Sequence, residues 1–258
     1  MVGTAFAFLL AAFQGGSAVS VTRSETPTVR IAAASDLRFA LPEILAAFHA
    51  ARPDVRGEAS YGSSGNFFAQ VREGAPFDVF LSADTEYTRR LFAEGVSEAP
   101  FPYAVGRLAL VVRKDSGLDP KGFGDLLKSP AIRRVAIANP AHAPYGRAAE
   151  AALRSWKVYD LVAAKLVYGD SVSQAAQFMD TGAAQAALIA LSLLTRAKSS
   201  EFVFAEVPET AHPPLDQAGV VLKKSASLES ARSFEAFLTG EAGRAILARY
   251  GFGLPTRR

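Results

Sequence analysis

Four short polar loops contain the residues of this sequence that could do chemistry. They occupy residues 34–36, 61–66, 143–146 and 169–173, and each lies between an apolar run typical of a β-strand and a stretch with helical spacing. Junctions of this kind direct the free backbone N–H groups of helix N-termini towards a common place. Several N–H donors together can stabilise an anion, so such loops can hold one without any charged side chain.

Within the loops, Ser35 and Ser64 can each donate a hydroxyl and a backbone N–H group. Tyr145 lies just before another predicted helix, and Val172 can contribute only its N–H group. Any one loop could be an ordinary helix cap, because serine and aspartate are preferred N-cap residues. Four loops, two of them expected in each half of the fold, favour a binding cleft instead.

Two aspartates, Asp36 and Asp170, are neighbours of these loops. They could bind a cation, orient other groups or act as a general base. Alternatively, they could complement the dipole of a first helical turn while facing solvent, and we favour this second interpretation.

The sequence carries no other pattern of a catalytic or metal site. The three histidines, His49, His142 and His212, lack metal-ligand spacing. His142 either lines the mouth of the cleft or is an ordinary loop residue. A Gly-x-Ser-x-Gly elbow and a phosphate loop ending in Gly-Lys-Ser/Thr are both absent. We therefore expect a binding protein with no cofactor and no metal cation, not an enzyme.

The elements that must position the loops alternate between strand and helix, which predicts an α/β fold with helices on both faces of its sheets. Predicted strands occupy residues 29–34, 56–61, 77–83, 108–113, 135–138, 165–168, 186–192, 202–207 and 218–223. Predicted helices occupy residues 66–73, 85–94, 122–127, 147–156, 173–181, 228–238 and 241–250.

A further helix is predicted between Leu37 and Phe48, where apolar residues recur at helical spacing. Pro42 interrupts it. Either a first turn over residues 35–40 is followed by a kink, or the main helix starts at Pro42.

Two proline-rich segments, at residues 100–106 and 213–217, look like crossings between lobes. We therefore expect two lobes joined by two strands. Residues 24–105 and 216–258 form the first lobe, and residues 106–215 form the second.

Composition limits the class of protein. The 258 residues carry a formal net charge of +3, half of them are hydrophobic, and none is cysteine. Disulfides, thiolate metal sites and a lipidated leader cysteine are thereby excluded. The basic residues are scattered, so we expect no nucleic-acid partner, and we expect a monomer.

Residues 1–20 resemble a secretory signal peptide, with a short apolar core and small residues before a cleavage site near Ala18 or Ser20. No Lys or Arg precedes the apolar core. The other interpretation is a buried N-terminal helix or strand.

The loops, taken in order, resemble the periplasmic molybdate-binding proteins of ABC importers. The matching segments are AAASDLRFAL at residues 32–41, YGSSGN at 61–66, FDVFLSAD at 77–84, ANPAHAPYG at 138–146, GDSVSQA at 169–175 and RYGF at 249–252. The resemblance extends over residues 29–254. It implies a type II periplasmic binding protein fold, in which two lobes with mixed sheets close on a ligand about a two-strand hinge.

The resemblance also implies the site. Ser35 and Ser64 would donate hydroxyl and amide hydrogen bonds, and the amides of Asp36, Tyr145 and Val172 would complete a cage around a tetrahedral oxyanion. Some family members place a tyrosine on a later strand, but the matching position here, near Ala190, has none. Tyr145 is the residue that could supply the missing hydroxyl.

The function implied is capture of molybdate, with tungstate as a second ligand, in the periplasm and delivery to a membrane permease. The sequence leaves open a receptor for another oxyanion such as sulfate, or for a small carboxylate. A periplasmic enzyme that uses Asp36 or Asp170 as a base is the alternative from another class.

Overall fold

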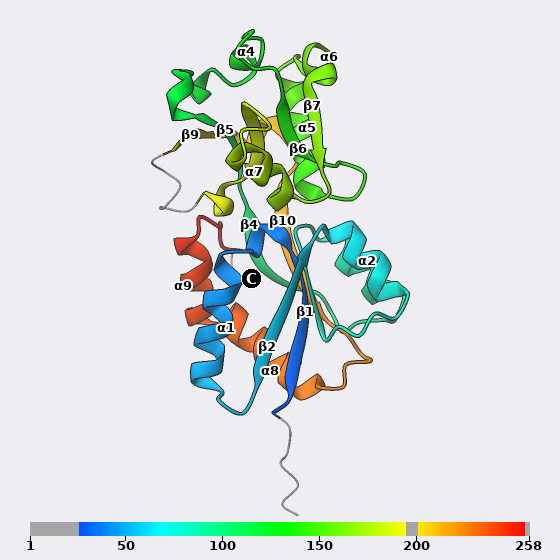
Figure 1. The fold of residues 1–258 in the computed structure, drawn as a ribbon. Coiled ribbons are helices and arrows are strands. Elements are labelled where there is room, and N and C mark those ends of the chain that lie inside the picture. The colour runs from blue at the N-terminus through cyan, green and yellow to red at the C-terminus, as the bar shows by residue number, and fades with distance from the viewer. Residues whose placement is uncertain (1–25, 195–200, 256–258) are drawn as a thin grey trace, which may run out of the picture.

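The computed structural model describes residues 26–194 and 201–255, which form two α/β lobes stacked end to end (Figure 1). The predicted signal peptide lies outside the described residues. Each lobe is built on one five-stranded mixed sheet, which confirms the predicted fold class.

The sheet of the first lobe has the strand order β2-β1-β3-β10-β4. Strand β1 runs parallel to β2 and β3, whereas β10 runs antiparallel to β3 and β4. The strands are β1 (Thr28–Ala34), β2 (Arg56–Gly62), β3 (Val79–Ser82), β4 (Phe101–Gly106) and β10 (Leu215–Val221).

Helices cover both faces of this sheet because successive side chains of a strand point to opposite faces. Ile31 of β1 packs in a cluster with residues of α1, α8 and α9, while its neighbour Ala32 packs with residues of α2 and α3. Figure 1 shows α1, α8 and α9 on one side of β1 and α2 on the other. The helices are α1 (Ala40–Ala51), α2 (Ser64–Arg72), α3 (Glu86–Ala93), α8 (Leu228–Thr239) and α9 (Glu241–Arg249).

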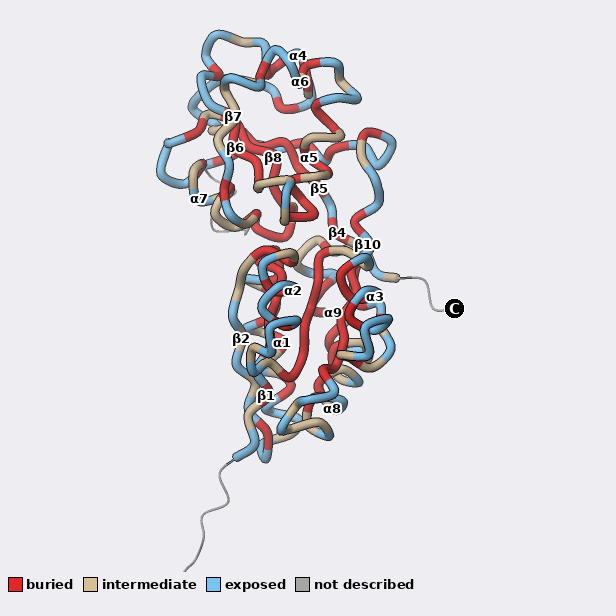
Figure 2. The backbone as a smooth tube through the Cα atoms, turned by 90° about the vertical axis from the view of Figure 1, so that its right-hand side faces the viewer, coloured by how far each residue is buried: buried red, intermediate tan, exposed pale blue. Residues whose placement is uncertain are grey.

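The sheet of the second lobe has the order β7-β6-β8-β5-β9, with β6 parallel to β7 and β8 and with β5 antiparallel to both its neighbours. Its three central strands, β6, β8 and β5, are almost entirely buried (Figure 2). The strands of the sheet are β5 (Leu108–Arg113), β6 (Val135–Ala138), β7 (Leu166–Gly169), β8 (Ala186–Ala190) and β9 (Phe202–Glu206). The helices of this lobe are α4 (Phe123–Leu127), α5 (Pro144–Ser155), α6 (Tyr159–Val162) and α7 (Val172–Asp180).

The chain changes sheets at two places that lie side by side, between β4 and β5 and between β9 and β10 (Figure 1). Residues 100–106, predicted as a crossing segment, are mostly the strand β4. Pro102 is accepted there because β4 is an edge strand, where a missing N–H group costs no ladder bond. The lobe limits at residues 105/106 and 215/216 stay a prediction.

Three helices begin earlier than predicted. Helix α2 starts at Ser64, α5 at Pro144 and α7 at Val172. The start at Pro144 follows from the fixed φ of proline, which suits the first position of a helix. These corrections matter because they place the candidate residues within first helical turns.

Pro42 lies in the first turn of α1, after the separate 3₁₀ turn η1 (Ser35–Leu37). The N–H groups of a first turn have no intrahelical acceptor, so the proline removes no helical hydrogen bond. The main helix therefore starts two residues before Pro42. The short helix α6 was not predicted.

Candidate functional site

All four polar loops meet in one small pocket between the lobes. Its cavity volume is only ≈ 10 Å³, and every predicted ligand residue lines it. These residues are Ser35, Asp36, Ser64, Tyr145 and Val172. We call this space the interlobe pocket.

Ser64 stands at the first position of α2 and is 1% exposed. Its hydroxyl oxygen accepts a hydrogen bond from the backbone N–H of Ala83, at 2.9 Å. A hydroxyl that accepts from one side keeps its own proton for another acceptor. Ser64 is thus prepared to donate into the pocket, and the N–H of Ala83 fixes its position.

Ser35 follows β1 directly and is 2% exposed. Its hydroxyl oxygen accepts from the backbone N–H of Ser173, on α7 of the second lobe, at 3.2 Å. This bond crosses from one lobe to the other. The proton of the Ser35 hydroxyl remains available, as it does at Ser64.

The second lobe contributes the first turns of α5 and α7. Tyr145 and Val172 lie within these turns, whose N–H groups have no intrahelical acceptor. The Ser171 side chain caps α7 by accepting from the N–H of Gln174, which leaves the N–H of Val172 uncapped by it. Both lobes therefore direct neutral donors at the interlobe pocket.

The hydroxyl of Tyr145 points towards β4 and β10, the strands next to the two crossings between the lobes, which we call the hinge strands. It is 3.4 Å from Nε2 of Gln217 and close to Gly106, where a Cβ atom would come within 2.3 Å of it. The hydroxyl is thus engaged with the hinge strands. The supply of a ligand hydroxyl by Tyr145 stays a prediction.

Asp36 is completely buried at the hinge. Nε2 of Gln217 donates to its Oδ2 at 2.5 Å, and the hydroxyl of Ser192 donates to its backbone carbonyl at 2.8 Å. Burial raises the pKa of the Asp36 carboxyl from 3.8 to about 6, although hydrogen bonds from Gln217 and Tyr145 oppose the shift. Asp170, in contrast, is exposed on its loop. The expected solvent-facing role therefore fits Asp170 and is wrong for Asp36.

The lobes touch through further polar contacts around the pocket. The backbone N–H of Gly65 donates to the carbonyl of His142 at 2.9 Å, and Nδ1 of His142 lies 2.9 Å from the hydroxyl oxygen of Ser63. His142 thus lies at the cleft. The other histidines contact nearby backbone carbonyls, and no cluster of metal-binding side chains occurs within residues 26–194 and 201–255.

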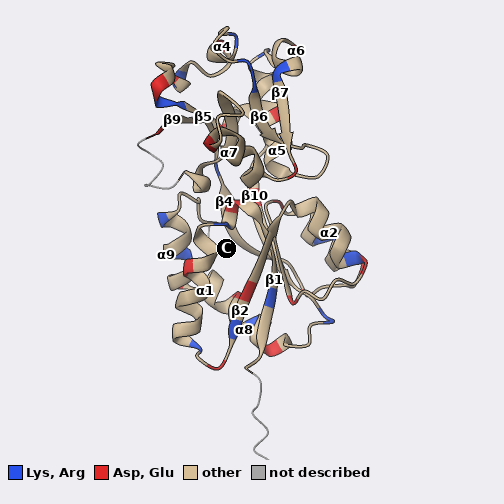
Figure 3. Ribbon diagram, in the orientation of Figure 1, with Lys and Arg blue, Asp and Glu red and all other residues tan. Residues whose placement is uncertain are grey.

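An ion pair also bridges the lobes. Arg147 on α5 lies 2.5 Å from the carboxylate of Asp84, and it also approaches the hydroxyl of Tyr87. Elsewhere, segments that carry Lys or Arg and segments that carry Asp or Glu are interspersed along the ribbon of both lobes (Figure 3). No helix in the described parts of the chain is both long and apolar enough to span a membrane.

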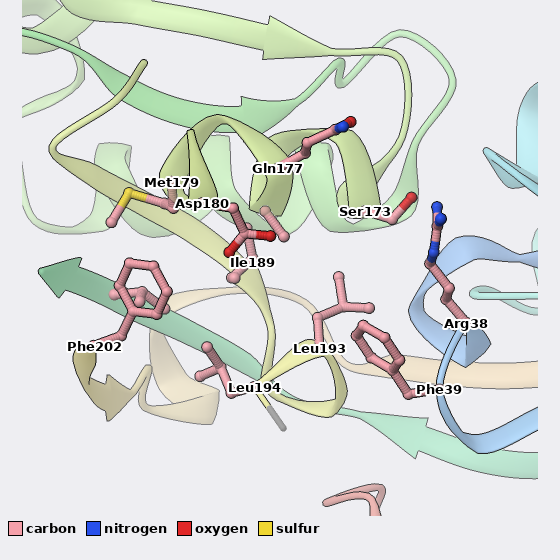
Figure 4. Close-up of a pocket in the computed structure, with 12 residues that line it drawn as sticks. Arg38, Phe39, Ser173, Gln177, Met179, Asp180, Ile189, Leu193, Leu194 and Phe202 are labelled. Atoms are coloured by element: carbon pink, nitrogen blue, oxygen red, sulfur yellow. The ribbon is translucent and has the colours of Figure 1, made fainter. Parts of the chain in front are cut away.

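A second pocket, of ≈ 280 Å³, lies nearby, mainly against the second lobe (Figure 4). Apolar side chains such as Met179, Ile189 and Phe202 line much of it, and Arg38 extends beside Ser173 at one end. None of the five predicted ligand residues contributes to its lining. It is therefore distinct from the interlobe pocket.

Sequence reasoning missed Gln217, Ser192 and Arg147. Gln217 lies in a segment interpreted as a connector, and the other two belong to no motif of the four loops. Only their contacts across the fold identify them.

Comparisons with known proteins agree with this geometry. A family model described as bacterial extracellular solute-binding protein matches residues 29–253. The molybdate-binding protein ModA of Azotobacter vinelandii is 36% identical over 198 residues, which cover 76% of this chain and 78% of the relative. ModA of Rhodobacter capsulatus is 37% identical over 196 residues, 75% of each chain.

Solved structures have the same fold. The periplasmic molybdate-binding protein of Azotobacter vinelandii matches with a TM-score of 0.82 and 29% identity, covering 88% of this chain and all of the other. The sulfate-binding protein SubI of Mycobacterium tuberculosis matches with a TM-score of 0.73 and 17% identity, covering 89% of this chain and 88% of the other, a likeness of fold alone. The chain belongs to the bacterial extracellular solute-binding proteins, in the molybdate-binding ModA family of ABC transport receptors, and is not an enzyme.

Proposed function

We propose that this protein captures molybdate, and also tungstate, in the interlobe pocket. Ser35 and Ser64 donate their hydroxyl and amide hydrogens, and the amides of Asp36, Tyr145 and Val172 complete the cage. The observation that carries the proposal is the convergence of these five residues from both lobes on one pocket. The identity of the anion is inferred from the relatives of this chain, which are named molybdate-binding proteins.

The chemistry of the pocket supports an oxyanion. Helix N-termini and hydroxyls disperse the charge of a dianion among many neutral donors, and hydrogen bonds to a charged acceptor are stronger than neutral ones. Because both lobes contribute donors to the pocket, the lobes must close on the anion. This closure is a hinge motion about β4 and β10.

Cavity size then selects among anions. Sulfate has shorter bonds than molybdate, so its oxygens would fall short of some donors, and each lost hydrogen bond costs about 1–3 kcal/mol. Molybdate and tungstate are nearly equal in size and would bind alike. The fold is shared with a sulfate-binding protein, so selectivity must reside in the pocket itself.

Titration calorimetry with molybdate, tungstate, sulfate and phosphate tests the proposal. We expect heat and tight binding for the first two anions, and weak or no binding for the others. Tight sulfate binding without molybdate heat would instead support the sulfate alternative.

We further propose that the chain acts in the periplasm as a monomer, after removal of residues 1–20, and delivers its anion to the membrane permease of an ABC importer. Loaded protein should stimulate ATP hydrolysis by a molybdate-type permease in proteoliposomes. Failure of the loaded protein to stimulate any such permease would contradict this delivery role.

A further inference from the structure

We propose that Asp36 is a neutral carboxylic acid when the interlobe pocket holds its anion, so that capture of the anion takes up one proton. This inference rests on the proposed function, because it concerns the same pocket. It goes beyond that function by giving the side chain of Asp36 a role separate from that of its amide. Because the protonated carboxyl is uncharged, it places no buried negative charge beside the bound dianion.

The position of Asp36 supports this role. Its carboxyl is completely buried between the hinge strand β10 and the second lobe, and it adjoins Ser35 of the pocket. In the described residues no ion pair to Asp36 is formed. A buried carboxylate without a cationic partner is strongly disfavoured relative to its protonated form.

The groups that face Asp36 are neutral. Tyr145 approaches from α5, Tyr103 from β4 and Gln217 from β10. Burial raises the pKa of both tyrosines well above 10, so neither ionises near neutral pH. On its own segment, Arg38 is exposed and extends beside Ser173 (Figure 4).

Two buried oxygen atoms beside each other's side chains, one on Asp36 and one on Gln217, receive no hydrogen bond from the part of the chain that the structure describes. Oδ1 of Asp36 and Oε1 of Gln217 are both buried acceptors without a protein partner. Gln217 itself is 1% exposed. An added proton on Asp36 supplies a donor for Oε1 if Gln217 turns its amide, and it leaves Oδ1 as a neutral carbonyl oxygen, whose burial costs less than that of a carboxylate oxygen.

The bound anion further favours the protonated form of Asp36. Burial, partly offset by hydrogen bonds, raises the pKa of Asp36 to about 6, and a dianion held next to Ser35 raises it further because like charges repel. When the lobes are open, water reaches the carboxyl and its pKa returns towards the ordinary value. Loading therefore takes a proton from solvent to a carboxyl oxygen of Asp36, and affinity falls as pH rises between the two values.

Calorimetry in buffers of different ionisation enthalpy measures this proton directly. At about pH 5.5 we expect uptake of close to one proton per molybdate, and an affinity that falls by up to tenfold per pH unit above it. The variant Asp36→Asn mimics the neutral acid, so it should bind without proton uptake and with little pH dependence. The matched variant Asp170→Asn removes an exposed carboxylate of the neighbouring loop and should keep the proton uptake, as should His142→Gln.

The outcomes separate this inference from the function on which it rests. Each protein is titrated with molybdate, tungstate and sulfate. Binding of any of these anions by the unmodified protein without proton uptake overturns the inference alone, and so does equal uptake by Asp36→Asn. Absence of molybdate heat, with proton-linked binding of sulfate, counts against the proposed ligand and supports the role of Asp36. Absence of heat from all three anions overturns both.

Discussion

The guanidinium of Arg147, on α5 of the second lobe, lies 2.5 Å from the carboxylate of Asp84, on the first lobe. The two residues are 63 positions apart in the chain, and the Arg147 side chain also lies over the ring of Tyr87. The pair connects the lobes beside the interlobe pocket. Because it requires the lobes to be close together, it can stabilise only their closed arrangement.

The first prediction concerns this pair. Arg147→Met should weaken molybdate binding by about 2–10-fold, since a partly exposed ion pair contributes on the order of 1 kcal/mol. The control is Arg154→Met on the same helix, whose partner Glu150 belongs to the same lobe. Calorimetry should show no change in the control, and an equal loss in both variants would contradict a role of Arg147 in closure.

The second prediction concerns the two serine hydroxyls. Ser35→Ala and Ser64→Ala should each weaken molybdate binding roughly tenfold or more, because each removes a charge-assisted hydrogen bond worth about 1.5–3 kcal/mol. Ser116→Ala, on an exposed turn of the second lobe, is the control. Unchanged affinity in both pocket variants would refute the assignment of the site.

The third prediction concerns the close approach of the lobes at Gly65. A Cβ atom at this position would lie 2.7 Å from the carbonyl oxygen of His142 and 2.8 Å from the hydroxyl oxygen of Tyr87. Because His142 belongs to the second lobe, Gly65→Ala should hinder closure and reduce affinity at least tenfold.

Gly122→Ala is the matched control for this substitution, because its added Cβ meets nothing closer than 3.7 Å. Small-angle scattering supplies an independent measurement. Molybdate should compact the unmodified protein and the control but not Gly65→Ala. Full compaction of Gly65→Ala would show that the contact with His142 does not limit closure.

The fourth prediction separates the two groups that Tyr145 could offer. The amide of Tyr145 is directed by the first turn of α5, while its hydroxyl is held near Gln217 at the hinge. We therefore expect Tyr145→Phe to bind molybdate less than tenfold more weakly than the unmodified protein. A loss as large as that of Ser64→Ala would mean that the hydroxyl reaches the anion.

The sequence by itself determined the elements and the order of the loops. Apolar runs at residues 108–113 and 135–138 predicted β5 and β6 with the bounds that the structure has. Such strands are buried on both faces and therefore read as continuous apolar segments. Ser35, Ser64, Tyr145 and Val172 also came from sequence, because serine, glycine and proline mark the junctions between strands and helices. The resemblance to the molybdate-binding proteins added the amide of Asp36.

The edge strand β4 could not be predicted in the same way. All of β4 lies in the proline-rich segment 100–106, and the strand exists because β10 pairs with it over residues 215–219. Pairing between segments more than 100 residues apart leaves no mark in the local pattern of β4 itself.

Only the tertiary structure decided what surrounds the loops. Asp36 looked like a solvent-facing acid, as Asp170 is, and the two sequences around them do not distinguish their environments. Asp36 is buried because Gln217, 181 residues away, and Ser192, 156 residues away, meet it where the lobes join. Local spacing indicates the junction near which a helix begins, whereas burial and the protonation of a carboxyl depend on contacts that form only when both lobes come together.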